Sequence, residues 1–329
     1  MKLHDNIDFF KDAIRVTAKR LNILDIYVEK DYWVTYALKL IFNSELSEET
    51  VFKGGTSLSK CYGLIDRFSE DIDLVVLRKK NETPNQLKKK IRHISKILGL
   101  YLPEVDIDDI TQKKGMNRKT AHVYKKAFDS PFGQIRDKII VEASWLGNAN
   151  PHTQRIVSSY VHDMMNFKKQ FQLIGQYELQ PFKLNVLEPK RTLCEKIMSL
   201  IRFSYNDNPI MQLKKKIRHV YDLCLMLQNP ELMAFFNSDS FEELLLDVAQ
   251  KDVESYKSNN KWLSKHPNES LLFSNLADTW NLLKRTYSIE LRNLVFTNGR
   301  FPNEEKILKT LQKIKGRLET VSWSTKVNS

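Results

Sequence analysis

Two aspartates, Asp71 and Asp73, carry the most distinctive chemistry of this sequence. They alternate with Ile72 and Leu74, and Val75 continues the apolar pattern of a β-strand. Because successive side chains of a strand point to opposite faces, we expect both carboxylates on one face and the two aliphatic side chains in a core. Neighbouring carboxylates raise each other's pKa unless a cation lies between them. Mg²⁺, which prefers oxygen ligands, is the expected cation.

A glycine turn stands shortly before this strand in the sequence. Lys53-Gly54-Gly55-Thr56-Ser57 ends a short predicted strand and opens a predicted helix. The free backbone N–H groups of such a turn can hold phosphate oxygens. Each motif alone is common. A phosphate-binding turn followed closely by paired carboxylates, however, is the minimal equipment for phosphoryl or nucleotidyl transfer.

In these motifs the sequence resembles the AbiEii/AbiGii-type nucleotidyltransferase toxins, which include the mycobacterial MenT-type toxins. This family belongs to the DNA polymerase β-like nucleotidyltransferase superfamily. The resemblance rests on residues 53–60 (KGGTSLSK) and 67–74 (RFSEDIDL), and extends to residues 28–35 (VEKDYWVT), 195–196 (EK) and 218–223 (RHVYDL). It covers about residues 28–227, and the segment after Pro230 is not part of it.

The resemblance implies an enzyme that transfers a nucleoside monophosphate from a nucleoside triphosphate (NTP) to RNA, with the tRNA 3′ end as favoured acceptor. It also implies one or two Mg²⁺ ions, a toxin–antitoxin or abortive-infection system of phage defence, and a cognate antitoxin protein. The catalytic residues it implies are Asp71, Asp73, Lys196 and Asp222. The nucleotide-binding residues are Lys53, Gly54, Gly55, Thr56, Ser57, Arg67 and Ser69, and the metal ligands are Asp71, Asp73 and Glu142.

Lys196 falls on the apolar side of a predicted helix, between Leu200 and Phe203 when residues are projected at 100° intervals. A lysine there must extend its amine to solvent, pair with an anion or face a cleft. The residues alone favour the first of these. The resemblance instead implies a catalytic lysine that neutralises the triphosphate and the departing pyrophosphate.

Asp222 and Glu142 each have two interpretations. Asp222 follows Arg218 by one helical turn, which suits a surface ion pair. The resemblance instead implies an active-site carboxylate that positions Lys196 or the acceptor. Glu142 is the only acid in the apolar stretch 139–144, and it suits either a third metal ligand or a solvent-facing side chain.

The net charge is +12, with a pI of about 9.3. This favours a polyanionic partner over a merely lysine-rich surface. The basic residues cluster at 88–92, 113–126 and 214–218, and the second cluster includes His122 and Tyr124, which suit phosphate contact and base stacking. Two rival functions stay open: transfer to a small molecule or protein, and a non-catalytic RNA-binding module.

Composition excludes several classes of protein. No apolar run of 18 residues and no secretory signal pattern is present, so we expect neither a membrane span nor export, but a cytoplasmic protein. The three cysteines, Cys61, Cys194 and Cys224, are far apart in apolar segments and predict neither disulfides nor a zinc site.

The pattern predicts an α+β fold: a polymerase β-like core with a mixed sheet flanked by helices over residues 1–163, and a mainly helical domain over 164–329 that completes the active-site cleft. For residues 29–31 (EKD), the sequence favours a structural role, in which these charged side chains anchor the N-terminal helices. Predicted strands cover residues 50–53, 71–77, 121–128, 138–144 and 181–187, with a hairpin turn at 131–133. Predicted helices cover residues 6–21, 27–42, 56–62, 86–98, 190–203, 211–228, 231–236, 241–255, 270–287 and 304–321, with a polar linker at 258–268.

Overall fold

The computed structural model describes residues 1–69, 71–113, 115–128, 137–147, 149–256, 259–296 and 299–327. The chain forms two compact units, each built from three segments. Unit 1 comprises Met1–Tyr62, Phe68–Trp145 and His152–Leu187, and unit 2 comprises Gly63–Arg67, Leu146–Pro151 and Glu188–Ser329. The last passage from unit 1 to unit 2 falls after Leu187.

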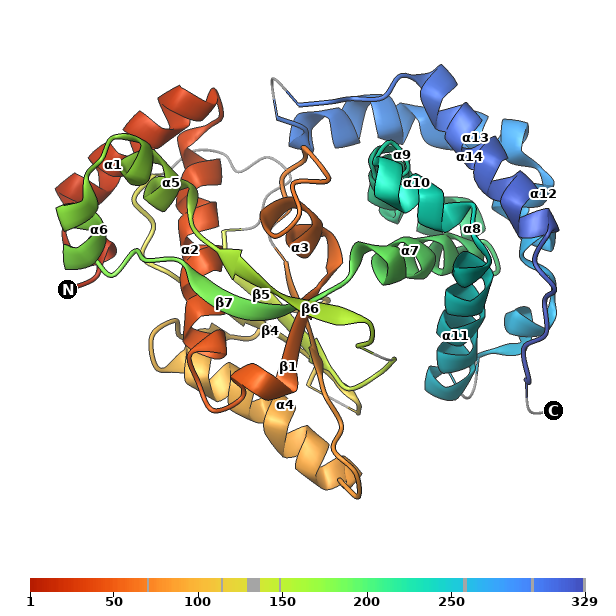
Figure 1. Ribbon diagram of the computed structural model, residues 1–329, viewed down its shortest axis with the longest axis horizontal. Coiled ribbons are helices and arrows are strands. Elements are labelled where there is room, and N and C mark those ends of the chain that lie inside the picture. The colour runs from red at the N-terminus through yellow and green to blue at the C-terminus, as the bar shows by residue number, and fades with distance from the viewer. Residues whose placement is uncertain are drawn as a thin grey trace. The chain divides into compact units, whose positions relative to one another are not determined.

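Unit 1 is built on one mixed sheet of seven strands, in the order β3-β4-β5-β2-β1-β7-β6 (Figure 1). The strands are β1 (Thr50–Lys53), β2 (Ile72–Val76), β3 (Glu104–Val105), β4 (Asn117–His122), β5 (Ile139–Ser144), β6 (His152–Val157) and β7 (Phe182–Leu187). Strand β2 pairs antiparallel with β1 and parallel with β5, so it lies inside the sheet. The most apolar strands occupy this centre, where helix α4 (Pro84–Gly99) covers one face.

Six helices surround this sheet: α1 (Ile7–Leu21), α2 (Asp25–Phe42), α3 (Gly54–Lys60), α4 (Pro84–Gly99), α5 (Tyr160–Phe167) and α6 (Phe171–Gln176). Helix α4 packs on β2, β4 and β5, and α1 packs on α2 and α5 (Figure 1). Ile72 and Leu74 of β2 are buried in the same core as Ile91 and Ile94 of α4. Strand alternation therefore turns Asp73 away from the α4 face.

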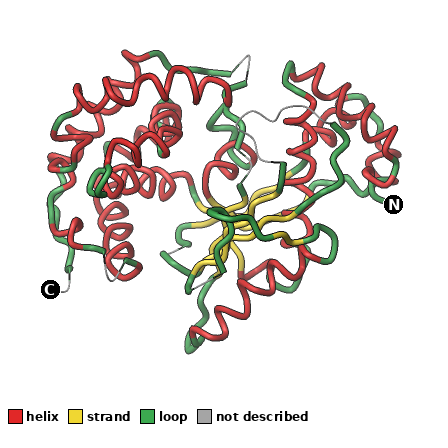
Figure 2. Tube along the Cα trace, turned by 180° about the vertical axis from the view of Figure 1, so that it is seen from behind, coloured by secondary structure: helices red, strands yellow, loops and turns green. Residues whose placement is uncertain are grey.

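Within the described residues of unit 2, all helices and strands named are helices, and loops join them, as the colouring in Figure 2 shows. Its helices are α7 (Pro189–Phe203), α8 (Pro209–Lys215), α9 (Ile217–Met226), α10 (Pro230–Phe236), α11 (Asp239–Ser255), α12 (Leu271–Ser274), α13 (Leu276–Arg285) and α14 (Glu304–Glu319). Helix α7 packs on α9 and α11, and α9 packs on α14. Proline at the first turn of α7, α8 and α10 marks three of these helix starts.

Most predicted elements are confirmed, with several corrections. The predicted strand 121–128 is wrong in position, because β4 ends at His122, and the edge strands β3 and β6 were not predicted. The predicted helix 211–228 is divided at Lys216, and 270–287 is divided at Asn275. The predicted linker 258–268 contains a short 3₁₀ turn with buried Trp262 and Leu263. The hairpin turn predicted at 131–133 lies outside the described residues.

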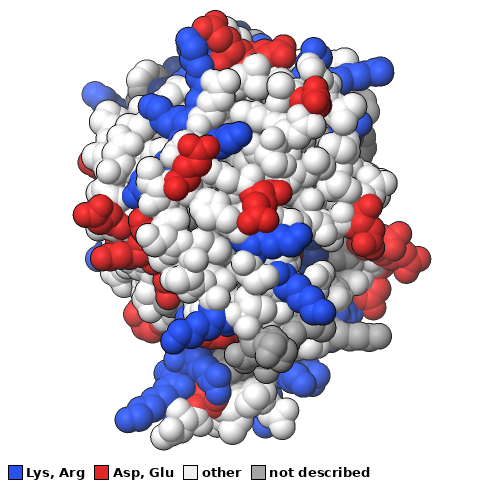
Figure 3. Space-filling view, turned by 90° about the vertical axis from the view of Figure 1, so that its right-hand side faces the viewer, with Lys and Arg blue, Asp and Glu red and all other residues white. Residues whose placement is uncertain are grey.

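Among the described helices, none is long and apolar enough to cross a lipid bilayer. On the face shown in Figure 3, basic side chains are interspersed with acidic ones over most of the surface. On this face the excess of positive charge is therefore divided among separate groups of side chains.

Candidate active site

Asp73 stands in the middle of unit 1, between two other charged side chains. In the register of the sheet, it pairs with Lys53 on β1 and with Glu142 on β5. Asp71 precedes the first residue of β2 by one position. The sheet thus brings Glu142, chosen from the sequence as the third carboxylate, next to Asp73 across a parallel strand pair.

The glycine turn lies directly against Asp73. Gly54 has φ +83°, and a Cβ built on it would stand 2.1 Å from Asp73 Oδ2. Both the left-handed backbone and this close approach require glycine at this position. Helix α3 begins at Gly54, two residues earlier than predicted, so the N–H groups of its first turn start beside the Asp73 carboxylate.

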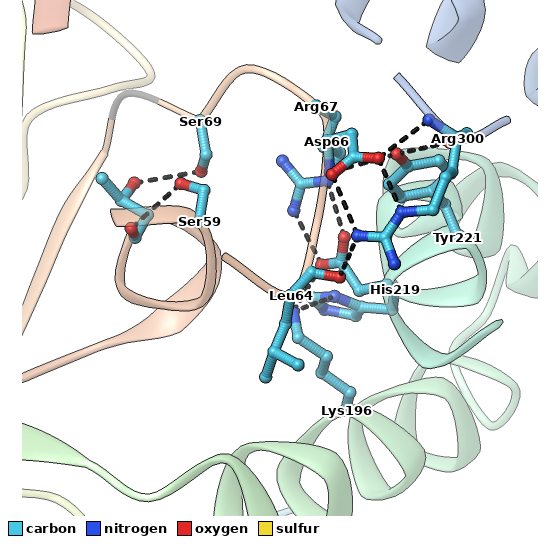
Figure 4. Close-up of polar contacts among 11 residues, drawn as sticks. Ser59, Leu64, Asp66, Arg67, Ser69, Lys196, His219, Tyr221 and Arg300 are labelled. Atoms are coloured by element: carbon cyan, nitrogen blue, oxygen red, sulfur yellow. Dashed lines mark hydrogen bonds and ion pairs between the residues drawn. The ribbon is translucent and has the colours of Figure 1, made fainter. Parts of the chain in front are cut away.

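The hydroxyls of the turn fix its main chain. Thr56 donates a hydrogen bond of 2.6 Å to the carbonyl of Asp71, and its oxygen lies 3.0 Å from the Ser69 hydroxyl (Figure 4). Ser57 donates to the Gly54 carbonyl at 2.9 Å. Both side chains are buried; Thr56 ties the glycine turn to the residue before β2, and Ser57 holds the turn on itself.

The carboxylates of Asp71, Asp73 and Glu142 lie close enough for their negative charges to affect the pKa of Asp73. Burial raises the pKa of Asp73 to about 7, and the negative charges of Glu142 and Asp71 act in the same direction. Lys53 and Lys119 oppose the shift. Glu142 also accepts a hydrogen bond of 2.9 Å from Asn117, and its other oxygen lies 3.5 Å from the Lys119 amine.

A divalent cation suits this arrangement. Within the described residues, no three His, Cys, Asp or Glu side chains are gathered into a ready metal-binding group. However, Asp73 and Glu142 face each other across paired strands, and the pKa of Asp73 is raised first by burial and then by repulsion from Glu142 and Asp71. A cation near Asp71, Asp73 and Glu142 would remove that repulsion, and carboxylate oxygens are the ligands that Mg²⁺ prefers.

The charged residues 29–31 anchor α2 to the rest of unit 1, as the sequence favoured. Asp31 forms a buried ion pair with Lys60 on α3 and accepts a hydrogen bond of 2.8 Å from the Tyr160 N–H. Glu29 accepts from the Ala127 N–H at 2.6 Å, and Lys30 donates to the carbonyl of Lys138. The Asp31–Lys60 pair therefore joins α2 to the helix that begins with the glycine turn.

Unit 2 contains a second charged cluster, centred on Asp222 of α9 (Figure 4). Arg67 binds both oxygens of this carboxylate, through Nε and Nη2, at 2.7 Å each. The Lys196 amine on α7 donates to Asp222 Oδ2 at 2.7 Å and lies 3.4 Å from His219 Nδ1. Arg67, Lys196 and Asp222 are all at least 95% buried.

One carboxylate here compensates two cations. Burial alone would raise the pKa of Asp222, but Arg67 and then Lys196 overcome it and hold that pKa well below its ordinary value. Burial, with Lys196 as the next cause, lowers the pKa of His219 well below 6.5. His219 is therefore neutral near pH 7, and the cluster carries an excess positive charge that suits an anionic ligand.

The sequence matches the family described as "Nucleotidyl transferase AbiEii toxin, Type IV TA system" over residues 37–308. The chain belongs to this family. A search of solved structures found MenT4, a nucleotidyltransferase toxin from Mycobacterium tuberculosis H37Rv, with 14% sequence identity, a TM-score of 0.46, and coverage of 94% of this chain and 98% of that one. No curated protein matches the sequence. This AbiEii-family chain is thus a nucleotidyltransferase toxin of a type IV toxin–antitoxin system.

In this AbiEii toxin, two local interpretations of the sequence are wrong. Lys196 does not extend its amine to solvent, because it is 5% exposed and paired with Asp222. Asp222 is fully buried, so it is not part of a surface ion pair with Arg218. Arg67, predicted to bind nucleotide, directs its guanidinium to Asp222. No local pattern indicates this last contact, because 155 residues separate its two members.

The basic segment 113–126 of this AbiEii toxin also needs a correction. His122 is fully buried on β4, where its ring nitrogens lie 2.9 Å from the Leu102 carbonyl and 3.0 Å from the Thr120 hydroxyl. Tyr124 is 9% exposed and stacks on Trp33. Neither ring is placed to stack on a nucleobase, so only the lysines and arginine of this segment remain candidates for RNA contact.

Proposed function

We propose that this AbiEii toxin transfers a nucleoside monophosphate from an NTP to an RNA hydroxyl, with the tRNA 3′ end as acceptor. The observation that carries the proposal is the contact between Gly54 and Asp73, with Glu142 on the adjacent strand. This contact places a glycine turn whose N–H groups can bind phosphate next to carboxylates that can bind a cation. Membership of the AbiEii family supports the same chemistry.

In this proposal Asp71, Asp73 and Glu142 hold one or two Mg²⁺ ions. When bound, such an ion supplies Lewis-acid stabilisation of charge on the phosphate oxygens. The main-chain N–H groups that start at Gly54 and Gly55 hold phosphate oxygens of the NTP. The acceptor hydroxyl bonds to the α-phosphorus, and the bond from that phosphorus to the pyrophosphate oxygen breaks.

Lys196 has a separate role in this proposal. Asp222 and His219 each engage its amine, which limits the directions in which its remaining N–H can point. An amine oriented in this way supplies a fixed positive charge for the triphosphate and for pyrophosphate as it departs. Asp222 acts by positioning Lys196, and Arg67 acts by positioning Asp222.

The proposed RNA acceptor is supported by the net charge of +12. Phosphate contacts release counterions, so transfer to RNA weakens steeply as salt concentration rises. Transfer to a small molecule lacks this dependence. A tRNA acceptor also places the action of the toxin in the cytoplasm, where its antitoxin counteracts it.

The test incubates the purified toxin with each labelled NTP, total tRNA and Mg²⁺. We expect label on tRNA, which is lost with EDTA and in the variants Asp71→Asn, Asp73→Asn and Lys196→Met. The exposed residues Asp12 and Lys309, each 71% exposed, provide matched controls, Asp12→Asn and Lys309→Met, which should retain transfer. Label that appears only on small molecules or protein, or equal labelling in the three variants, would contradict the proposal.

A further inference from the structure

Arg300 reaches back 234 residues to hold Asp66. Its guanidinium binds both carboxylate oxygens, with 2.7 Å from Nε to Oδ2 and 3.0 Å from Nη2 to Oδ1 (Figure 4). Its backbone N–H donates to Asp66 Oδ2 at 2.8 Å, and Nη2 also donates to the carbonyl of Leu64 at 3.3 Å. Four hydrogen bonds thus join Arg300 to the loop Gly63–Arg67.

The main chains on either side of this ion pair are also joined. The Phe296 N–H donates to the Asp66 carbonyl at 3.0 Å, and Val295 forms a β-bridge with Arg67. A Cβ at Gly299 would stand 2.8 Å from Asp66 Cβ and 2.9 Å from its carbonyl oxygen. The approach of the C-terminal segment to the loop is therefore too close for any side chain at position 299.

Tyr221 links this contact to α9. Its hydroxyl donates to the Arg300 carbonyl at 2.9 Å and accepts from the Asp66 N–H at 3.3 Å. Tyr221 is fully buried and immediately precedes Asp222 in the sequence. The same helix thus presents one side chain to the Asp66–Arg300 pair and the next to Arg67.

The two ion pairs of this loop differ sharply in exposure. The Arg67 and Asp222 side chains are 3% and 0% exposed, whereas those of Arg300 and Asp66 are 50% and 24% exposed. Adjacent residues of one loop therefore make a buried pair and an accessible pair. The accessible pair fixes the backbone from which the buried Arg67 side chain extends.

We propose that Arg300 is a positioning residue: by holding Asp66 it fixes Arg67 against Asp222 and so orients the Lys196 amine. The inference rests on the proposed role of Lys196 in transfer. It gives the segment after Pro230, which the sequence left without a function, a part in building the site. In this inference Phe296, Gly299 and Arg300 act by supporting a group that takes part in the reaction.

A purely stabilising ion pair is the alternative, and the two roles differ in magnitude. A half-exposed ion pair contributes little to stability, because solvent screens its charges and ordering its side chains costs entropy. A displacement of about 1 Å in a group that acts on the substrate can cost on the order of 10²-fold in rate. A positioning role therefore predicts a large effect on kcat with little change in thermal stability.

The experiment compares Arg300→Ala and Arg300→Lys with Arg317→Ala. Arg317 also binds main-chain carbonyls within unit 2, those of Phe236 and Ser238, so it is a matched control. We expect Arg300→Ala to lower kcat by about 10-fold or more, with a melting temperature equal to that of the control. Arg300→Lys should recover only part of the loss, because lysine keeps the positive charge but its ammonium group cannot bind both carboxylate oxygens as the guanidinium does.

Hydrogen exchange provides a readout that does not depend on activity. In Arg300→Ala we expect faster exchange at the Phe296 amide and through Gly63–Arg67, with α11 unchanged. Tyr221→Phe, which keeps Arg300, should accelerate exchange at the Asp66 amide alone. If the wild type transfers nothing, the proposed function fails, and exchange at the loop still decides this inference. A kcat within twofold of the control, or unchanged exchange at the loop, would overturn it.

Discussion

The carboxylate of Asp73 occupies the space that a Cβ on Gly54 would fill, since such an atom would stand 2.1 Å from Asp73 Oδ2. A residue of the glycine turn and a residue of β2 are thus fitted to each other at the centre of the sheet. A substitution at either position must therefore displace the other residue, so the contact can be tested directly by mutation.

Gly54→Ala should abolish transfer. The backbone at φ +83° costs an alanine about 1–2 kcal/mol, and the added methyl group forces the Asp73 side chain to move. Gly115→Ala is the matched control, because Gly115 has φ +71° and a Cβ there meets nothing within 4 Å. Transfer assays and urea unfolding of both variants separate the two effects. Equal activity in the two variants would mean that the Gly54–Asp73 contact has no catalytic importance.

Asp222→Asn and Lys196→Met should separate stability from catalysis. Replacing Asp222 leaves the buried cations Arg67 and Lys196 without a charged partner, which costs about 3–5 kcal/mol. Lys196→Met keeps the bidentate pair of Arg67 and Asp222, so its free energy of unfolding should stay much closer to that of the wild type. Both variants should lose transfer. Chemical unfolding followed by circular dichroism measures the difference, and equal destabilisation would contradict this account of the cluster.

Stability should fall as the pH drops below about 6.5, and His122 is one of the buried histidines responsible, together with His219. Burial lowers the pKa of the His122 side chain in the folded state, so the unfolded chain binds the proton more readily. The contribution of neutral His122 is complete above the unfolded pKa and is lost as the pH falls from there, by up to about 1.4 kcal/mol per pH unit. Urea unfolding between pH 5 and pH 8 measures this slope.

His122→Gln should reduce that slope, and the part that remains belongs to the other buried histidines such as His219. The buried histidine makes its two hydrogen bonds through one protonated and one unprotonated nitrogen. An unchanged slope in His122→Gln would assign the acid sensitivity to other groups.

Asp31→Asn should destabilise unit 1 by about 3–5 kcal/mol, because it leaves the buried amine of Lys60 without its carboxylate. The double variant Asp31→Asn with Lys60→Met removes the unpaired charge as well and should recover part of the loss. Thermal unfolding of the single and double variants tests this. A double variant less stable than Asp31→Asn would show that Lys60 contributes through contacts other than this ion pair.

Periodicity was sufficient to predict the elements that carry the first cluster. The alternation around Ile72 and Leu74 located β2, and the single acid in an apolar strand located Glu142 beside Asp73. These are local patterns, in which burial of one face determines the structure. Edge strand β6, in contrast, presents mostly polar or exposed residues, so no alternation revealed it.

The second cluster could not be derived from local pattern. Sequence reasoning paired Asp222 with Arg218 because one helical turn separates them, whereas the fold pairs it with Arg67 and Lys196. The contact between Asp66 and Arg300 was missed for the same reason. Ion pairs between distant segments depend on tertiary packing, which charge and spacing along the chain do not encode locally.

Because Arg300 lies 234 residues after Asp66, the contact between them can form only after most of the chain has been synthesised. Ribosomes build proteins from the N-terminus, so the glycine turn, both aspartates, Lys196 and Asp222 are all made before Arg300. A message broken before the codon for Arg300 encodes every motif of a nucleotidyltransferase, but not the residue that holds Asp66. Under the inference drawn from this contact, damaged transcripts yield weakened toxin, and full toxicity requires translation to continue past that codon.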